Sequence, residues 1–151
     1  MPDKCIWLGF AGFCKTDIML YIARILVCLG ESVAIIDQSG SQDLRLSVPA
    51  GIYSEDRLDY RGVDVYLNCE SGIPKELAGT NHSVVLMDFG INSKAIELSG
   101  ELKTLFLITD LQRHHTVPLA SFLSRLPFSP DAIRIIRDIV PGKIRPRYID
   151  S

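Results

Sequence analysis

The chain has 151 residues, of which 47% are hydrophobic and 23% are charged. This composition is typical of one folded domain with a substantial core, and it excludes a disordered chain. The formal net charge of -2 provides no overall basic field for nucleic acid or for a membrane surface. We therefore expect a single domain over residues 1–151, with a short basic tail from about residue 141.

The first part of the chain alternates apolar runs with a helical pattern. Residues 4–9 form a short apolar run that ends in glycine, which is typical of a buried parallel strand. Residues 16–29 favour a helix that ends before Gly30. Its apolar side chains lie on nearly every side, as in a helix that is buried on more than one face or one that also contacts a partner. A second apolar run, 32–37, predicts the next strand.

Between the first strand and the first helix lies the sequence Gly-Phe-Ala-Gly-Phe-Cys-Lys-Thr, residues 9–16. It matches the phosphate-loop pattern G-x-x-x-x-G-K-[ST] at Gly9, Lys15 and Thr16, whereas Cys14 replaces the second glycine. In such a loop backbone N–H groups surround an anion, the lysine neutralises phosphate charge and the hydroxyl holds Mg²⁺. The stretch therefore resembles an eroded nucleotide-binding loop, in which Cys14 is either a filler or a thiol activated by the helix N-terminus.

The second part of the chain continues the alternation. Strands are expected at 63–68, 83–88, 104–109 and 132–140, helical segments at 74–78, 93–98 and 117–126, and irregular surface chain over 43–61. Apolar strands that alternate with helices predict βαβ units, a mainly parallel sheet and helices on both of its faces. The fold class is therefore α/β.

Three of the predicted strands end in an acid, at Asp37, Asp88 and Asp110. Ligands of an open parallel sheet bind beyond the carboxyl ends of the strands, so we expect these acids to share one rim with the loop at residues 9–16. An acid in that position can hold Mg²⁺ directly or through water. A strand-ending aspartate also commonly caps the turn that follows it, so each acid alone is weak evidence.

The cysteines and histidines give no metal signature. Cys5, Cys14, Cys28 and Cys69 form no C-x-x-C pair, and we expect Cys5 and Cys28 to be small buried hydrophobes. His114 and His115 are adjacent, which favours a pair on a surface loop over a metal site. No signal peptide or membrane span is predicted, so we expect a cytoplasmic protein that reaches a membrane only peripherally, through partners.

These features together resemble the ParA/MinD-type P-loop ATPases, the branch with a deviant Walker A motif. The resemblance covers residues 3–140, and it rests on residues 11–16, the helix ended by Gly30, Ile36-Asp37 and the run 84–88. It implies a three-layer P-loop sandwich that binds ATP and Mg²⁺ where the site is still functional. The residues implied are Gly9, Gly12, Lys15 and Thr16 for the nucleotide, Thr16, Asp37 and Asp88 for Mg²⁺, and Asp37 and Asp88 for catalysis.

Several positions depart from the pattern of this family. Its signature lysine falls on Phe10, and a second threonine after Thr16 is replaced by Asp17, which places negative charge beside the phosphate site. An acid in the first turn stabilises a helix when no anion is bound there. The pair Arg137-Asp138 stands where many members have a base-reading Asn-Arg pair, and the chain is shorter than many members. The sequence thus predicts a degenerate and truncated member.

Three functions follow as hypotheses. The leading one is a non-catalytic pseudo-ATPase that needs no cofactor and acts through a protein partner or a homodimer in a bacterial positioning, pilus or secretion assembly, with Phe10 and Phe13 at the interface. The second is a residual ATP/Mg²⁺-dependent dimerisation switch. The third is a DNA-binding accessory protein, although nucleic acid is not expected because the tail's basic residues are few and dispersed: Arg134, Arg137, Lys143, Arg145 and Arg147.

Overall fold

The structure is a computed structural model that describes residues 4–13, 15–49, 56–95, 102, 104–110 and 112–126, together with the backbone of 131–136. A seven-stranded sheet runs through these residues in the order β3-β4-β2-β5-β1-β6-β7. The strands are β1 (Ile6–Gly12), β2 (Val33–Asp37), β3 (Arg57–Tyr60), β4 (Val63–Tyr66), β5 (Val84–Gly90), β6 (Thr104–Thr109) and β7 (Asp131–Ile136).

All neighbouring strands of the sheet are parallel except β3 and β4, which form an antiparallel hairpin at one edge. The central strands β2 and β5 are buried along their whole length. This burial explains their near-continuous apolar sequences, because a parallel strand covered on both faces has no polar side.

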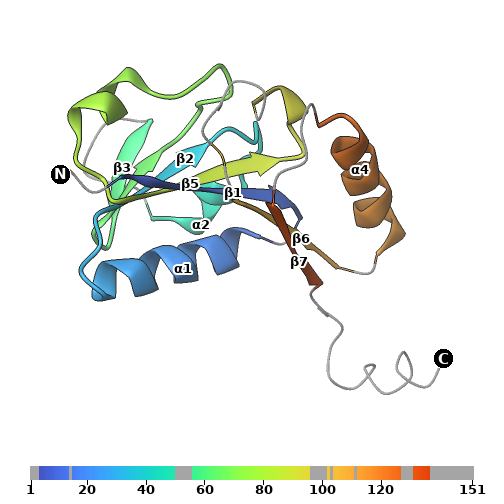
Figure 1. Ribbon diagram of the computed structural model, residues 1–151, viewed down its shortest axis with the longest axis horizontal. Helices are drawn as coiled ribbons and strands as arrows, with labels where there is room; N and C mark the ends of the chain where they lie inside the picture. Colours follow the sequence, from blue (N-terminus) through green and yellow to red (C-terminus); the bar gives the residue numbers. More distant parts are fainter. Residues whose placement is uncertain are drawn as a thin grey trace.

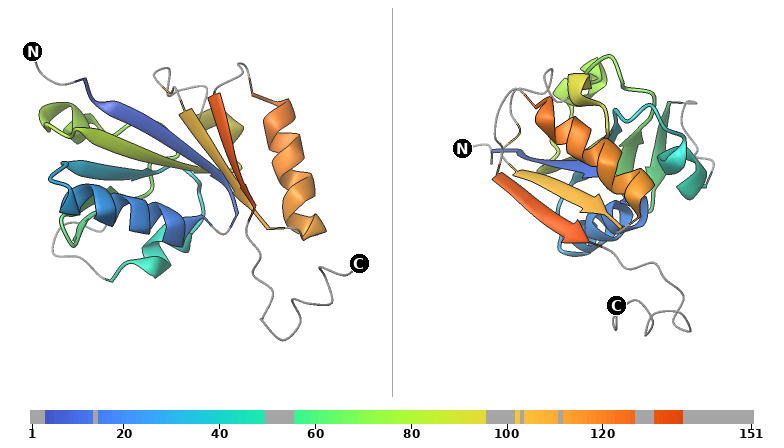
Figure 2. Two further views of the ribbon diagram at one scale, coloured as in Figure 1. Left: turned by 60° about the horizontal axis from the view of Figure 1, so that its bottom comes forward. Right: turned by 90° about the vertical axis from the view of Figure 1, so that its right-hand side faces the viewer.

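Helices cover both faces of the sheet, so the predicted three-layer α/β architecture is confirmed (Figures 1 and 2). Helices α1 (Thr16–Cys28) and α2 (Asp43–Ser47) lie on one face, where Met19 and Leu44 pack with Val33 and Ile35. The 3₁₀ helix η1 (Lys75–Gly79) and helix α4 (Arg113–Ser124) lie on the other, where Leu77, Leu119 and Phe122 pack against the sheet.

Helix α1 follows β1 directly and ends as its sequence predicts. Gly30 adopts a φ of 94°, and the N–H groups of Gly30 and Glu31 donate to Val27 O and Leu26 O over 3.0 Å each. This is the Schellman arrangement that a glycine after the last turn allows. One face of α1 is nevertheless open to solvent and Cys28 is exposed, so the expectation of burial on several faces, and of a buried Cys28, is wrong.

Two further expectations are corrected. Residues 43–61, expected to be irregular, contain α2 and β3, because Leu44 and Leu58 are buried in the core and anchor these short elements. His114 and His115 lie in the first turn of α4 and not in a loop. Residues 93–95 are helical, as predicted for 93–98, and the remainder of that segment lies outside the described residues.

Candidate functional site

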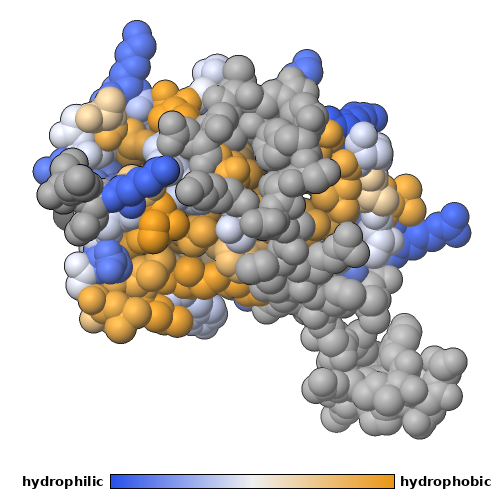
Figure 3. All heavy atoms as spheres, in the orientation of Figure 1, coloured by the Kyte–Doolittle hydropathy of each residue, from blue (hydrophilic) through white to orange (hydrophobic). Residues whose placement is uncertain are grey.

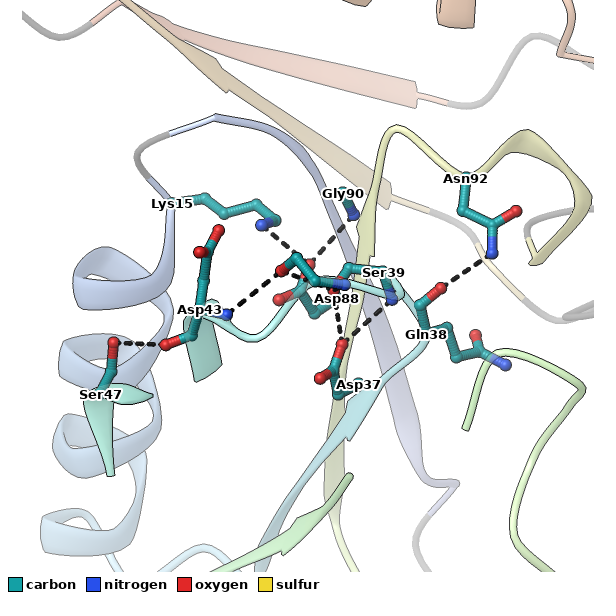
Figure 4. Close-up of polar contacts among 10 residues, drawn as sticks. Lys15, Asp37, Gln38, Ser39, Asp43, Ser47, Asp88, Gly90 and Asn92 are labelled. Carbon is teal, nitrogen blue, oxygen red and sulfur yellow. Dashed lines mark hydrogen bonds and ion pairs between the residues drawn. The ribbon is translucent and has the colours of Figure 1, made fainter. Parts of the chain in front are cut away.

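The predicted rim is formed at the carboxyl ends of β2 and β5, where Asp37 and Asp88 are register partners on adjacent strands. Lys15, immediately before α1, reaches into this rim, and its Nζ lies 3.1 Å from Asp88 Oδ1 (Figure 4). Both side chains are buried, Lys15 being 3% exposed and Asp88 0%. The structure therefore brings Lys15, Asp37 and Asp88 together.

Asp88 is a buried carboxyl, and only one of its two oxygens has polar partners among the described residues. Its Oδ1 accepts the Gly90 N–H over 3.0 Å as well as the Lys15 contact, while its buried Oδ2 has no hydrogen-bond partner among the described residues. Burial raises the pKa of Asp88 to about 6, and the neighbouring Asp37 adds to this, whereas Lys15 and the Gly90 N–H act in the opposite direction. The Lys15–Asp88 pair is thus an ion pair withdrawn from solvent.

Asp37 caps the turn that follows β2. Its Oδ1 accepts both the backbone N–H of Ser39, at 3.0 Å, and the Ser39 hydroxyl, at 2.6 Å. Burial raises the pKa of Asp37, and the two Ser39 hydrogen bonds and the charge of Lys15 partly offset the increase. Asp37 therefore has a clear structural role, which is the simpler of the two interpretations of a strand-ending acid.

The glycines of the predicted loop belong to the sheet. Strand β1 continues to Gly12, and residues 10–12 pair with β6 in regular parallel register, while Phe10 and Ala11 also pair with β5. Only residues 13–15 separate the end of β1 from the start of α1. Backbone N–H groups that lie in a ladder between two strands are directed at neighbouring strands and not at an anion.

At Gly9 and at Gly12 a side chain would also meet neighbouring atoms of the sheet or its covering residues. A Cβ on Gly9 would come within 2.8 Å of Phe89 and 2.9 Å of Leu102. Gly12 has a φ of 108°, and a Cβ there would lie 2.0 Å from Ile108 O. The next N–H, that of Phe13, donates to the same Ile108 O over 2.8 Å. Gly12 is therefore required for strand packing, whether or not a ligand binds, whereas a Cβ at Gly9 would displace the ends of the Phe89 and Leu102 side chains.

The two aromatic residues of the loop have different environments. Phe10 is 0% exposed and stacks on Phe106 with ring centroids 4.9 Å apart, so it lies in the core and not at an interaction surface, contrary to expectation. Its position on a central strand makes that burial unavoidable. Phe13 is partly exposed and stacks on His115 at 4.5 Å.

His115 links this loop to the end of β6. Its Nδ1 lies 2.8 Å from both carboxylate oxygens of Asp110, and Asp110 Oδ1 also accepts the Gln112 N–H over 2.9 Å. Burial opposes ionisation of Asp110, but these hydrogen bonds prevail and lower its pKa. Asp110 therefore holds the turn between β6 and α4, and it follows the carboxyl end of β6, on the same edge of the parallel sheet as Asp37 and Asp88.

The remaining predicted site residues are less informative. Thr16 is partly exposed at the first position of α1, and Asp17 beside it is exposed. Together with Phe13, His115 and residues of α2 they line an open groove of about 500 Å³. Within the described part of the chain no three His, Cys, Asp or Glu side chains are placed to share a metal ion. Cys14, Arg137 and the basic tail lie outside the described residues.

Sequence reasoning missed two features of this molecule. One is a cavity of about 580 Å³ beside the β3–β4 hairpin, which is lined by Tyr66, Asn68 and Glu76 among others. The other is a row of exposed apolar side chains on α1 and its C-cap residue, at Tyr21, Ile25 and Leu29. The second could have been found from the i, i+4, i+8 spacing, whereas the first depends on a hairpin that the sequence did not indicate.

The architecture is that of ParA and MinD structures. Similar solved structures include a ParA family ATPase from Chlorobium tepidum TLS, with a TM-score of 0.65 and 16% identity, over 97% of this chain and 80% of that chain. The MinD cell division protein of Aquifex aeolicus is also similar, with a TM-score of 0.57 and 14% identity, over 95% of this chain and 73% of that one.

A third similar structure is the MinC:MinD cell division protein complex of Aquifex aeolicus, with a TM-score of 0.56 and 13% identity, over 95% of this chain and 72% of the matched one. No protein-family model matches the sequence, and no curated protein matches it. Among the helices that the structure describes, none is both long enough and apolar enough to cross a bilayer. The likeness thus establishes a ParA/MinD-like P-loop fold.

Proposed function

We propose that this chain is a non-catalytic ParA/MinD-like protein that acts by binding proteins, as an interaction or scaffold component of a bacterial positioning, pilus or secretion assembly. The observation that carries this proposal is the course of β1. Because the strand continues through Gly12, the backbone that would surround phosphates is paired with β6 in the sheet. The residues present do not fit a nucleotide cradle, and we derive no hydrolysis step for them.

The charges of the rim support the same proposal. Lys15, the residue that would neutralise phosphate, is held by Asp88 at 3.1 Å in a buried pair. Asp17 adds an exposed negative charge at the N-terminus of α1, where an anionic ligand would sit. Helix N-termini favour anions, and an aspartate side chain in the first turn already uses that preference.

A protein partner is supported by the surface of α1. Tyr21, Ile25 and Leu29 follow one another at intervals of one turn and are 69%, 59% and 73% exposed, which makes a stripe of large side chains along the helix. Figure 3 shows hydrophobic residues on the surface in the region of α1. Leu46 of α2 is a further exposed apolar side chain, and it lines the groove that also contains Asp17, one turn before Tyr21. Contiguous apolar patches of this kind mark contact surfaces, whereas isolated exposed side chains do not.

We place a homodimer contact at this α1 stripe, in place of Phe10. The stripe exposes on the order of 500 Å² per chain, the upper range for a monomer, so two copies packed stripe to stripe would bury about 1,000 Å², near the minimum for a specific interface. A straight helix can pair with its own copy about a two-fold axis, which requires one self-complementary surface only. MinD of Aquifex aeolicus, a similar fold, forms a complex with the protein MinC.

A residual ATP/Mg²⁺ switch is the second candidate. It is favoured by the proximity of Lys15, Asp37 and Asp88, and by the buried Asp88 Oδ2 that lacks a hydrogen-bond partner. Thr16, Asp37 and Asp88 are the residues that would hold Mg²⁺, which would neutralise phosphate charge when bound. For this function the end of β1 would have to leave the sheet.

Calorimetric titration with ATP·Mg²⁺ distinguishes the two candidates. The non-catalytic proposal predicts no binding heat at millimolar nucleotide for the unmodified chain and for Thr16→Ala. Micromolar binding that is lost in Thr16→Ala and in Lys15→Ala would contradict it and would support the switch. Thr16→Ala is the better variant, because Thr16 is partly exposed and its loss leaves no buried charge.

A further inference from the structure

A second cavity lies at the edge of the sheet opposite β7, away from the Lys15–Asp88 pair. It has a volume of about 580 Å³, within the range of small-molecule sites. Strand β3, the end of β4 and the segment between β4 and η1 line it, and one side of it is open to solvent. The polar and charged side chains that line it are those of Asp56, Arg57, Tyr66, Asn68, Ser71 and Glu76.

Tyr66 provides a buried donor at the inner wall of this cavity. The residue is 3% exposed, and its Oη is buried with no hydrogen-bond partner among the described residues. Buried hydroxyl groups are almost always paired, because an unpaired one loses its bonds to water without compensation. Burial also raises the pKa of Tyr66, so the phenol keeps its proton and remains a donor. A ligand with an acceptor oxygen would complete this site.

The charges around the cavity leave one negative group in excess. Arg57 is paired with Asp64 at 3.7 Å, and Asp56 is paired with Arg45 at 3.6 Å and accepts from Asn68 over 2.6 Å. Glu76 is exposed and has no ion pair in the described part of the chain. The outer part of the cavity therefore favours a cationic group, while the inner wall offers a donor.

We propose that this cavity binds a free α-amino acid, with the Tyr66 hydroxyl donating to the ligand carboxylate and Glu76 accepting from its ammonium group. The Arg57 guanidinium lies 5.1 Å from the centroid of the Tyr66 ring and adds positive potential beside the carboxylate. For a ligand to reach the Tyr66 hydroxyl, the Arg57 side chain must move away from the Tyr66 ring. Arg57 is 37% exposed, which leaves room for this movement. The site is independent of the proposed scaffold function and lies on a different part of the sheet.

The test uses the whole chain and the twenty common amino acids as separate probes at about 10 mM, with thermal unfolding as the first readout, since a ligand that binds only the folded state raises its stability. At least one amino acid is expected to raise Tm, and its N-acetyl derivative, which lacks the ammonium charge, is not. Calorimetry on the responding amino acid is expected to show at least about tenfold weaker binding for Tyr66→Phe and for Glu76→Gln.

Tyr60→Phe is the matched control, because Tyr60 lies at the other end of the same hairpin and outside the cavity lining. It should bind like the unmodified chain. Tyr66→Phe should unfold at the same or a higher temperature than the unmodified chain in the absence of ligand, since it removes an unpaired hydroxyl. The proposal is overturned if no amino acid raises Tm, if Tyr66→Phe binds as tightly as Tyr60→Phe, or if Tyr66→Phe lowers the ligand-free Tm.

Discussion

Lys15 and Asp88 form an ion pair at 3.1 Å with almost no exposure to solvent, and they join the N-terminus of α1 to the end of the central strand β5. A buried pair of this kind gains little over an apolar pair, because desolvation of both charges offsets their attraction. Removal of one partner is much more costly, since the other charge is then buried alone. The contribution of each residue to the stability of the fold therefore depends on the presence of the other.

A double-mutant cycle measures this coupling. Lys15→Met leaves Asp88 buried without its cation, and we expect it to lower the free energy of unfolding by about 3–5 kcal/mol near neutral pH. The double variant Lys15→Met/Asp88→Asn removes both charges of this pair, although the Asp37 carboxyl stays buried, and it should recover most of that loss. Chemical denaturation of the unmodified chain, both single variants and the double variant provides the four values.

Additive losses in the cycle would contradict this expectation. They would mean that Lys15 and Asp88 stabilise the fold separately and that Lys15 is available to a ligand. A coupling energy between Lys15 and Asp88 well above 1 kcal/mol would support a site in which the two residues neutralise each other.

Asp88 also makes stability depend on pH. Its folded pKa of about 6 lies above the ordinary value of 3.8. Between these values the folded chain holds a proton that the unfolded chain releases, so a rise in pH favours unfolding. Stability should therefore fall as the pH rises from about 4 to about 6, by on the order of 3 kcal/mol for a difference of roughly two pKa units.

The measurement is the difference between the pH profiles of the unmodified chain and of Asp88→Asn. Asp37 has a raised pKa and contributes in the same direction, whereas Asp110 has a lowered pKa and contributes stability that is lost as the pH falls. These two groups are common to both proteins, so the difference reports Asp88 together with its electrostatic coupling to Asp37. Parallel profiles would show that Asp88 does not have its raised pKa.

Much of the central sheet is predictable from the sequence, for a clear physical reason. Strands β2 and β5 are fully buried parallel strands and β6 is a partly buried one, and such strands appear as apolar runs of five to seven residues. The acids at the ends of β2 and β5 were placed on one rim by topology alone. The fold class and the proximity of Asp37, Asp88 and Lys15 follow from these two rules.

The parts that sequence reasoning missed depend on contacts between distant residues. The β3–β4 turn places Arg61 at a φ of 51° and Gly62 at 89°, and Arg-Gly is not one of the residue pairs that signal such a hairpin. Strand β1 reaches Gly12 because Ile108 of β6 supplies a partner for it. A motif of eight residues cannot reveal a partner that lies almost one hundred positions away.

Gly12→Ala tests whether this glycine serves the sheet. A Cβ would lie 2.0 Å from Ile108 O at a φ that favours glycine, so we expect a loss of at least about 2 kcal/mol in stability, measured by denaturation without nucleotide. Gly79→Ala is the control, because no atom lies within 4 Å of the added carbon, and it should change stability by less than about 1 kcal/mol. A Gly12→Ala protein as stable as the control would refute the sheet role of Gly12.

Ile25→Glu tests the homodimer contact on α1. Ile25 is 59% exposed at the middle of the stripe between Tyr21 and Leu29, so a charge there should leave the monomer fold intact. In a dimer packed stripe to stripe the two glutamates would face each other without compensation, and we expect at least about tenfold weaker self-association.

Sedimentation equilibrium of both proteins over a range of concentrations measures this effect. Val117→Glu is the matched control, since Val117 is 58% exposed on α4, on the opposite face of the sheet from α1 (Figure 2). We expect Val117→Glu to self-associate like the unmodified chain and Ile25→Glu to remain monomeric. An unmodified chain that is monomeric at every concentration would refute the homodimer. Equal dimerisation of the two variants would show that the contact does not lie on α1.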